Sequence, residues 1–120
     1  MKPLATTALL LAVGTAASAA PVAGHYGAEL CVAQGEQAPN CGPAQARLAR
    51  GGRMQVQVSD IVYRLQLHSS QAEVLLMHGS MQIDEFTAPY EWAGSTLRFS
   101  DPQKPVHYEV RLGPRRAAPK

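Results

Sequence analysis

The feature that most constrains the fold is a strict alternation of apolar and polar side chains, repeated in separate segments. The segments are 26–32, 54–58, 61–67 and 106–112, and each has an apolar residue at every second position. Successive side chains of a β-strand point to opposite faces, so this period indicates strands with one buried and one solvated face. Parallel strands covered on both faces would be continuously apolar, so an antiparallel sheet is predicted.

A tight hairpin is predicted at Ser59-Asp60. The apolar positions are even-numbered before these two residues and odd-numbered after them. A two-residue turn would bring three apolar pairs onto one face, which favours a hairpin over a β-bulge. The predicted pairs are Val58 with Ile61, Val56 with Tyr63, and Met54 with Leu65.

The predicted fold class is all-β, with about seven strands. Further strands are expected at 72–77 and 96–99. Because consecutive strands must bury their apolar faces together, we expect a small antiparallel meander barrel or a nearly closed sandwich. One short helix is expected near 43–50, because Pro43 suits a first helical position and good helix formers follow it. An immunoglobulin-like sandwich is the alternative, but its cysteines lie further apart in sequence than these.

The ends of the chain predict its domain organisation. Residues 1–19 have a basic start, an apolar stretch and small residues at a cleavage point, as in a secretory signal peptide. Residues 20–113 are expected to form a single β-domain, and residues 114–120 a disordered basic tail. The sequence has no second long apolar run, so no membrane span is predicted. The three basic residues of the tail are too few to indicate nucleic-acid binding.

The two cysteines, Cys31 and Cys41, are predicted to form a disulfide bond. An even number of cysteines in an exported protein is typical of a bridge. Closing this short loop would stabilise the fold by about 2–3 kcal/mol. A redox or metal pair is disfavoured, since the spacing is not that of a Cys-x-x-Cys motif.

The segment EFTAPYEW predicts a contact surface for another protein. We expect residues 87–95 to be irregular, because they contain Pro89 and Gly94. Loops on rigid scaffolds often carry function, and Tyr and Trp are frequent interface anchors. The candidate partner-binding residues are Tyr90, Glu91, Trp92 and Glu85. For Trp92 the alternative is a place in the core.

Met77, His78 and Met81 form the alternative candidate, a Cu(I) site. Thioether and imidazole ligands suit this ion. A two-residue loop at His78-Gly79 would place Leu76 opposite Met81 and separate the sulfurs. A three-residue loop would place Met77 opposite Met81 and bring them together. The first arrangement matches more apolar pairs and is preferred.

The chain is therefore predicted to be a periplasmic or secreted binding protein and not an enzyme. It has no Gly-x-Ser-x-Gly, His-Glu-x-x-His or phosphate-loop motif. Neither a cofactor nor nucleic acid is expected, and the expected partner is a protein of the cell envelope. The plan of signal peptide, short disulfide and small β-domain is similar to that of several periplasmic binding proteins and hydrolase inhibitors, but no motif matches residue by residue.

Overall fold

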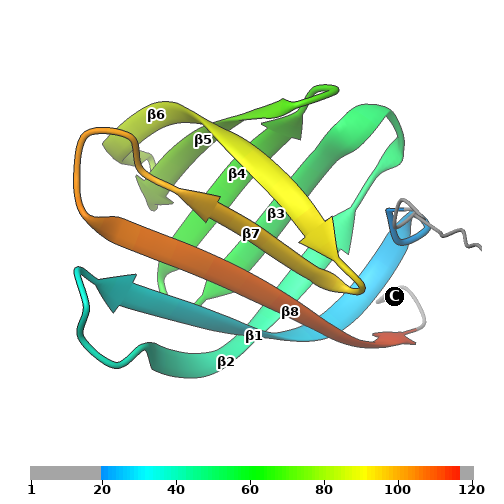
Figure 1. Cartoon of the computed structure of the whole chain (residues 1–120). Helices are drawn as coiled ribbons and strands as arrows, with labels where there is room; N and C mark the ends of the chain where they lie inside the picture. The colour runs from blue at the N-terminus through cyan, green and yellow to red at the C-terminus, as the bar shows by residue number, and fades with distance from the viewer. Residues whose placement is uncertain (1–19, 117–120) are drawn as a thin grey trace, which may run out of the picture.

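A computed structural model describes residues 20–116 and shows eight antiparallel strands closed into a barrel (Figure 1). Each strand pairs with the next along the chain, and the last strand pairs with the first. The fold class predicted from the alternation is therefore confirmed, with one strand more than expected. The strands are β1 (Gly24–Gln34), β2 (Asn40–Leu48), β3 (Arg53–Val58), β4 (Ile61–Leu67), β5 (Gln71–His78), β6 (Met81–Ala93), β7 (Thr96–Ser100) and β8 (Val106–Arg116). The predicted signal peptide, residues 1–19, lies outside the described residues.

The additional strand is β2, and it corrects the helix predicted near 43–50. Alanine favours helices in isolation, but here the segment pairs with β1 and β3 on its two sides. Proline has no backbone N–H to donate to a neighbouring strand. Pro43 is tolerated because the pairing of β2 with β3 begins only at Gln45, so no β3 residue needs a hydrogen bond from position 43. A single 3-10 turn, η1 (Arg50–Gly52), follows. The buried side chains of the segment alternate, as a strand requires: Ala44, Ala46 and Leu48.

The predicted hairpin between β3 and β4 is confirmed. Its turn is Ser59-Asp60, and Ser59 has a positive φ of 55°. The three expected pairs are present in the register: Val58 with Ile61, Val56 with Tyr63, and Met54 with Leu65. The parity change in the sequence therefore located both the turn and the register of this hairpin.

Strand β8 extends further than the predicted domain boundary at residue 113. Pro114, Arg115 and Arg116 belong to this strand, and the two arginines lie opposite Tyr26 and His25 of β1. These residues are ordered because their backbone helps to close the barrel. The rest of the predicted tail, residues 117–120, lies outside the described residues.

The interior of the barrel is filled with side chains. Leu97, Val56, Val74 and Val110 are its largest fully buried residues. An aromatic cluster packs beside them, with ring centroids 5.0–6.2 Å apart, and consists of Tyr63, Phe86, Phe99 and Tyr108. Burial, together with the neighbouring Tyr63, raises the pKa of Tyr108 to about 12. A small barrel normally has an interior filled in this way.

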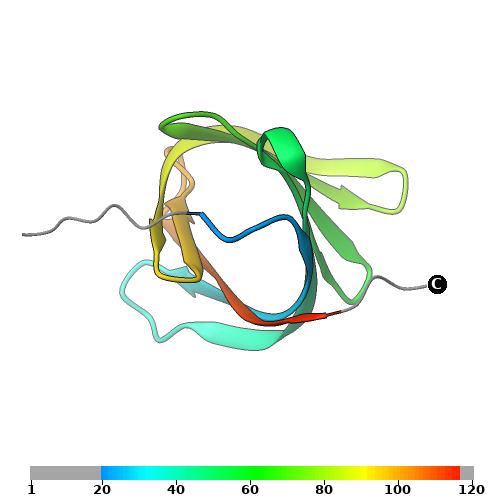
Figure 2. The same ribbon diagram turned by 90° about the vertical axis from the view of Figure 1, so that its right-hand side faces the viewer.

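The two ends of the barrel differ. At one end the first described residues cross the opening (Figure 2), and the hydroxyl of Tyr26 donates a hydrogen bond to the carbonyl oxygen of Val22. The opposite end, which we call the hairpin end, carries the turns that connect β1 to β2, β3 to β4, β5 to β6 and β7 to β8.

Candidate functional site

Cys31 and Cys41 lie directly opposite each other on β1 and β2 and form the predicted disulfide bond. Their Cα atoms are 4.0 Å apart. The carboxylate of Glu29 lies within 4.8 Å of both sulfur atoms, a grouping that resembles a metal site. Because the sulfurs are bonded to each other, they present no thiolate to a metal ion. The bridge therefore fastens a hairpin.

The predicted partner-binding residues are all in β6, so the expectation of an irregular segment at 87–95 is wrong. Tyr90 and Trp92 pack against the core, and the hydroxyl of Tyr90 donates a hydrogen bond to the carbonyl oxygen of His68. Glu85 and Glu91 alternate with them and lie on the outer face. The four side chains thus do not share one face.

Glu91 is part of an ion-pair ladder on the outer face. Arg98 lies 3.7 Å from Glu91 and 3.2 Å from Glu109, and Arg111 lies 3.1 Å from both Glu109 and Glu29. The ladder crosses four neighbouring strands, β6, β7, β8 and β1. Each exposed pair contributes little to stability. The carboxylate of Glu91 is nevertheless already paired within the protein.

Both registers predicted for the β5–β6 hairpin are wrong. The turn is Gly79-Ser80, and His78 lies opposite Met81. Met77 lies opposite Gln82, on the other face of the hairpin from His78 and Met81. A β-bulge then places Leu76 opposite Asp84 and leaves Ile83 without a cross-strand partner in this register. The three candidate copper ligands therefore do not lie on one face.

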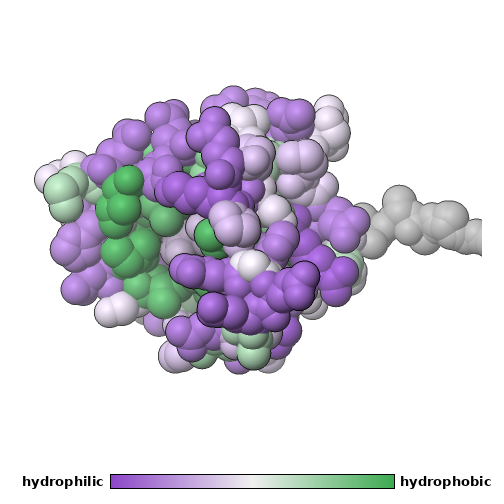
Figure 3. Space-filling model, turned by 60° about the vertical axis from the view of Figure 1, so that its left-hand side comes forward, coloured by the Kyte–Doolittle hydropathy of each residue, from purple (hydrophilic) through white to green (hydrophobic). Residues whose placement is uncertain are grey.

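The bulge exposes apolar side chains at the hairpin end. Met81 is 61% exposed and Ile83 is 50% exposed, and three half-buried apolar residues lie towards the same end of β3, β4 and β5. Figure 3 shows hydrophobic side chains gathered in one area of the face that it presents. We define the apolar end patch by exposure and strand position, as the apolar residues Val58, Ile61, Leu76, Met81 and Ile83. The alternation of apolar and polar residues does not reveal the bulge, and the patch is therefore not predictable from the sequence pattern.

An ion pair borders this patch. The Nζ atom of Lys104 lies 3.0 Å from a carboxylate oxygen of Asp84. The hydrogen bond from Lys104 holds the pKa of Asp84 below its ordinary value, and the same bond raises the pKa of Lys104. Both groups therefore remain charged across the physiological pH range.

Replacing Lys104 by methionine is expected to raise the pKa of Asp84 towards its ordinary value, because Lys104 is the main cause of the shift. The pKa can be measured from the carboxyl carbon resonance in an NMR titration. In the wild type, the contribution of Asp84 to stability is present above the ordinary carboxyl pKa and is lost as the pH falls through its lowered pKa. Arg98→Met is the control, since Arg98 pairs with other carboxylates. An unchanged titration of Asp84 in Lys104→Met would contradict the assignment.

Comparisons with known proteins identify no relative. No protein-family model matches the chain, and neither a curated protein nor a solved structure matches it. Within residues 20–116, no helix is long and apolar enough to cross a membrane. The geometry of the barrel is therefore the basis for a functional proposal.

Proposed function

We propose that this protein is a small exported binding protein whose partner is another protein of the envelope or the extracellular space, such as an enzyme that it inhibits or a complex that it joins. The apolar end patch is the observation that supports this proposal. The flexible side chain of Met81 and the branched side chain of Ile83 are both apolar and exposed to solvent. Exposed apolar patches often mark interaction sites, and methionine is enriched in protein interfaces.

The surroundings of the patch favour a protein over a small apolar molecule. The aromatic cluster fills the interior behind the patch, so a partner would contact the patch from outside. Asp84 and Lys104 supply charged groups at its border. An apolar centre with a charged rim is the usual arrangement of a protein interface.

Two features support the proposal that the protein is exported. The first 19 residues have the pattern of a secretory signal peptide. The disulfide bond between Cys31 and Cys41 is typical of proteins in oxidising compartments. Both features support a location in the periplasm or outside the cell.

We propose that the protein acts by binding and not by catalysis. Asp84, which is adjacent to Ile83 in sequence, is paired with Lys104, and Glu91 is paired with Arg98. The hydrogen bond from Lys104 holds the pKa of Asp84 below its ordinary value, whereas a general acid needs a raised pKa. The copper alternative gains no support from the hairpin, because Met77 lies on the opposite face from His78 and Met81.

A pulldown from envelope extract tests the proposal. The double substitution Met81→Asp and Ile83→Asp should reduce capture of a stoichiometric protein partner by about tenfold or more, since it places charge in the apolar contact. Val22→Asp is the matched control, because Val22 is 64% exposed and precedes β1 at the other end of the barrel. Circular dichroism should show that all variants remain folded.

Two results would contradict the proposal. One is equal capture by the double variant and the wild type, and the other is an equal loss in Val22→Asp. Tyr90→Ala and Glu91→Ala test the surface predicted from the sequence. A selective loss in these two variants would move the contact from the hairpin end to β6.

A further inference from the structure

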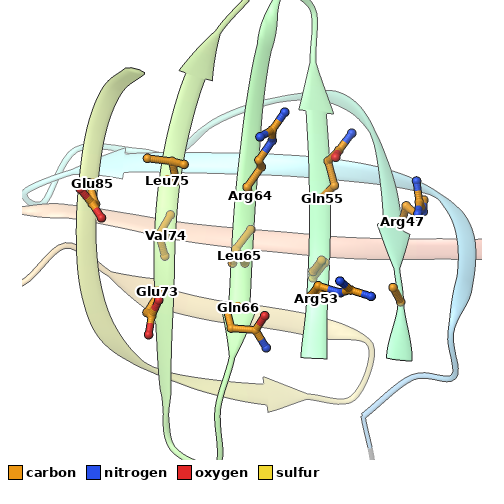
Figure 4. Close-up of a pocket in the computed structure, with 12 residues that line it drawn as sticks. Arg47, Arg53, Gln55, Arg64, Leu65, Gln66, Glu73, Val74, Leu75 and Glu85 are labelled. Atoms are coloured by element: carbon orange, nitrogen blue, oxygen red, sulfur yellow. The ribbon is translucent and has the colours of Figure 1, made fainter. Parts of the chain in front are cut away.

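A row of basic and amide side chains crosses the outer face of five neighbouring strands. Arg47 on β2 is the central member, and each residue of the row is the cross-strand partner of the next. Figure 4 shows three of them side by side on β2, β3 and β4. We call this the basic row, and it consists of Arg116, His25, Arg47, Gln55 and Arg64.

The row faces outward because its neighbours along each strand face inward. Ala46 and Leu48 flank Arg47 and are buried, and the same alternation applies on β3 and β4. The patch residues Val58, Ile61 and Leu76 pack against the core at the hairpin end, whereas the row lies on the outer face of its strands. The two surfaces are therefore distinct.

The three arginines of the row are evenly spaced. Arg116, Arg47 and Arg64 occupy every second strand, β8, β2 and β4. Adjacent strands lie about 4.8 Å apart, so successive arginines are about 10 Å apart at the backbone and the row is about 19 Å long. His25 and Gln55 occupy the strands between them.

The charges of these arginines are not neutralised within the described chain. In the described part of the chain, the arginines and lysines that form ion pairs are Arg98, Arg111 and Lys104. None of them belongs to the row. The sequence from 40 to 59 contains no Asp or Glu.

Two carboxylates, those of Glu85 and Glu73, border the row without an ion pair to its arginines. Leu75 lies between Arg64 and Glu85 in the same cross-strand line. Glu73, on the neighbouring strand, lies 2.9 Å from His68 and is held there. These acidic residues border the basic surface on the side of β5 and β6.

The composition of the row indicates the chemistry of its ligand. Guanidinium groups pair with carboxylate, sulfate or phosphate groups through two parallel hydrogen bonds, and an amide both donates to and accepts from hydroxyl groups. The row contains no Phe, Tyr or Trp, whereas single-stranded nucleic-acid sites rely on such side chains for base stacking. The even spacing of the arginines suits a linear ligand with repeated anionic groups.

We propose that the basic row binds an anionic polysaccharide. Arg116, Arg47 and Arg64 pair with successive acidic groups along the chain of sugars. His25 and Gln55 form hydrogen bonds with sugar hydroxyl groups between them. This surface is independent of the proposed protein contact and leaves the apolar end patch accessible.

Fluorescence anisotropy with labelled probes at low ionic strength tests the proposal. The probes are a heparin-derived oligosaccharide, an oligogalacturonate and a DNA duplex of similar total charge. We expect at least one glycan probe to bind more tightly than the DNA duplex. The double variant Arg47→Gln and Arg64→Gln should lose about tenfold or more in affinity for that glycan, because each removes a charge-assisted pair.

The matched control is Arg98→Gln with Arg111→Gln. It changes the net charge equally but removes arginines of the ion-pair ladder, so it should retain glycan affinity. The variant Met81→Asp with Ile83→Asp should also retain it, so the two proposals fail separately. Equal losses in the two arginine variants would overturn the proposal, since binding would then follow net charge alone. Tighter binding of the DNA duplex, or no glycan binding, would overturn it as well.

Discussion

Replacing Leu97 by alanine is expected to lower the free energy of unfolding by about 2–5 kcal/mol. Leu97 is fully buried on β7, between its cross-strand neighbours Trp92 and Val110. The substitution removes apolar contacts and leaves a cavity that the closed barrel cannot easily collapse. For a domain of this size, the melting temperature should fall by about 10 °C or more.

Leu75→Ala is the matched control for this experiment. Leu75 lies on the outer face of β5 and is only half-buried, so the same change should cost about 1 kcal/mol. Urea and thermal denaturation measure both variants. Similar losses in the two variants would show that Leu97 is not part of a tightly packed interior.

Replacing Gly52 by alanine is also expected to lower the free energy of unfolding strongly, by about 3 kcal/mol. Gly52 has a φ of 82°, a conformation that costs an L-residue about 1–2 kcal/mol. A Cβ atom added there would also lie 2.3 Å from the backbone oxygen of Leu67, which cannot move without disturbing the end of β4. The conformational cost and the collision therefore act together.

The adjacent Gly51 separates these two effects. Its φ is 79°, but an added Cβ atom would have no neighbour within 4 Å. Gly51→Ala should therefore cost about 1–2 kcal/mol, from the backbone conformation alone. Chemical denaturation of the two variants gives the difference. Equal losses would show that η1 does not approach β4 as closely as described.

The residues around Ser59-Asp60 explain why much of the fold could be predicted from the sequence. A change of parity at a two-residue turn has one simple geometric solution, and Val58 and Ile61 are paired accordingly. The neighbouring strand β2 was harder to predict. Ala44 and Ala46 have small side chains that fit either a helix or a strand, and the pairing with β1 and β3 decides between them.

The candidate surfaces were less predictable, because both depend on how strands are aligned. The bulge at Ile83 shifts the β5–β6 register and thereby exposes the apolar end patch. The arginines of the basic row are far apart in sequence, and only the registers of β8, β1, β2, β3 and β4 bring them into line. A local sequence pattern does not specify such long-range alignments.

The pairing of β1 with β8 has a consequence for folding kinetics. These strands are the first and the last of the described chain, so their contacts require the longest loop closure in the molecule. Non-local strand pairing of this kind slows folding. Until β8 is in place, β1 has an open edge that another chain can occupy. Closure of this seam is therefore expected to be a late event, and the interval before it is when the newly made protein most needs protection from aggregation.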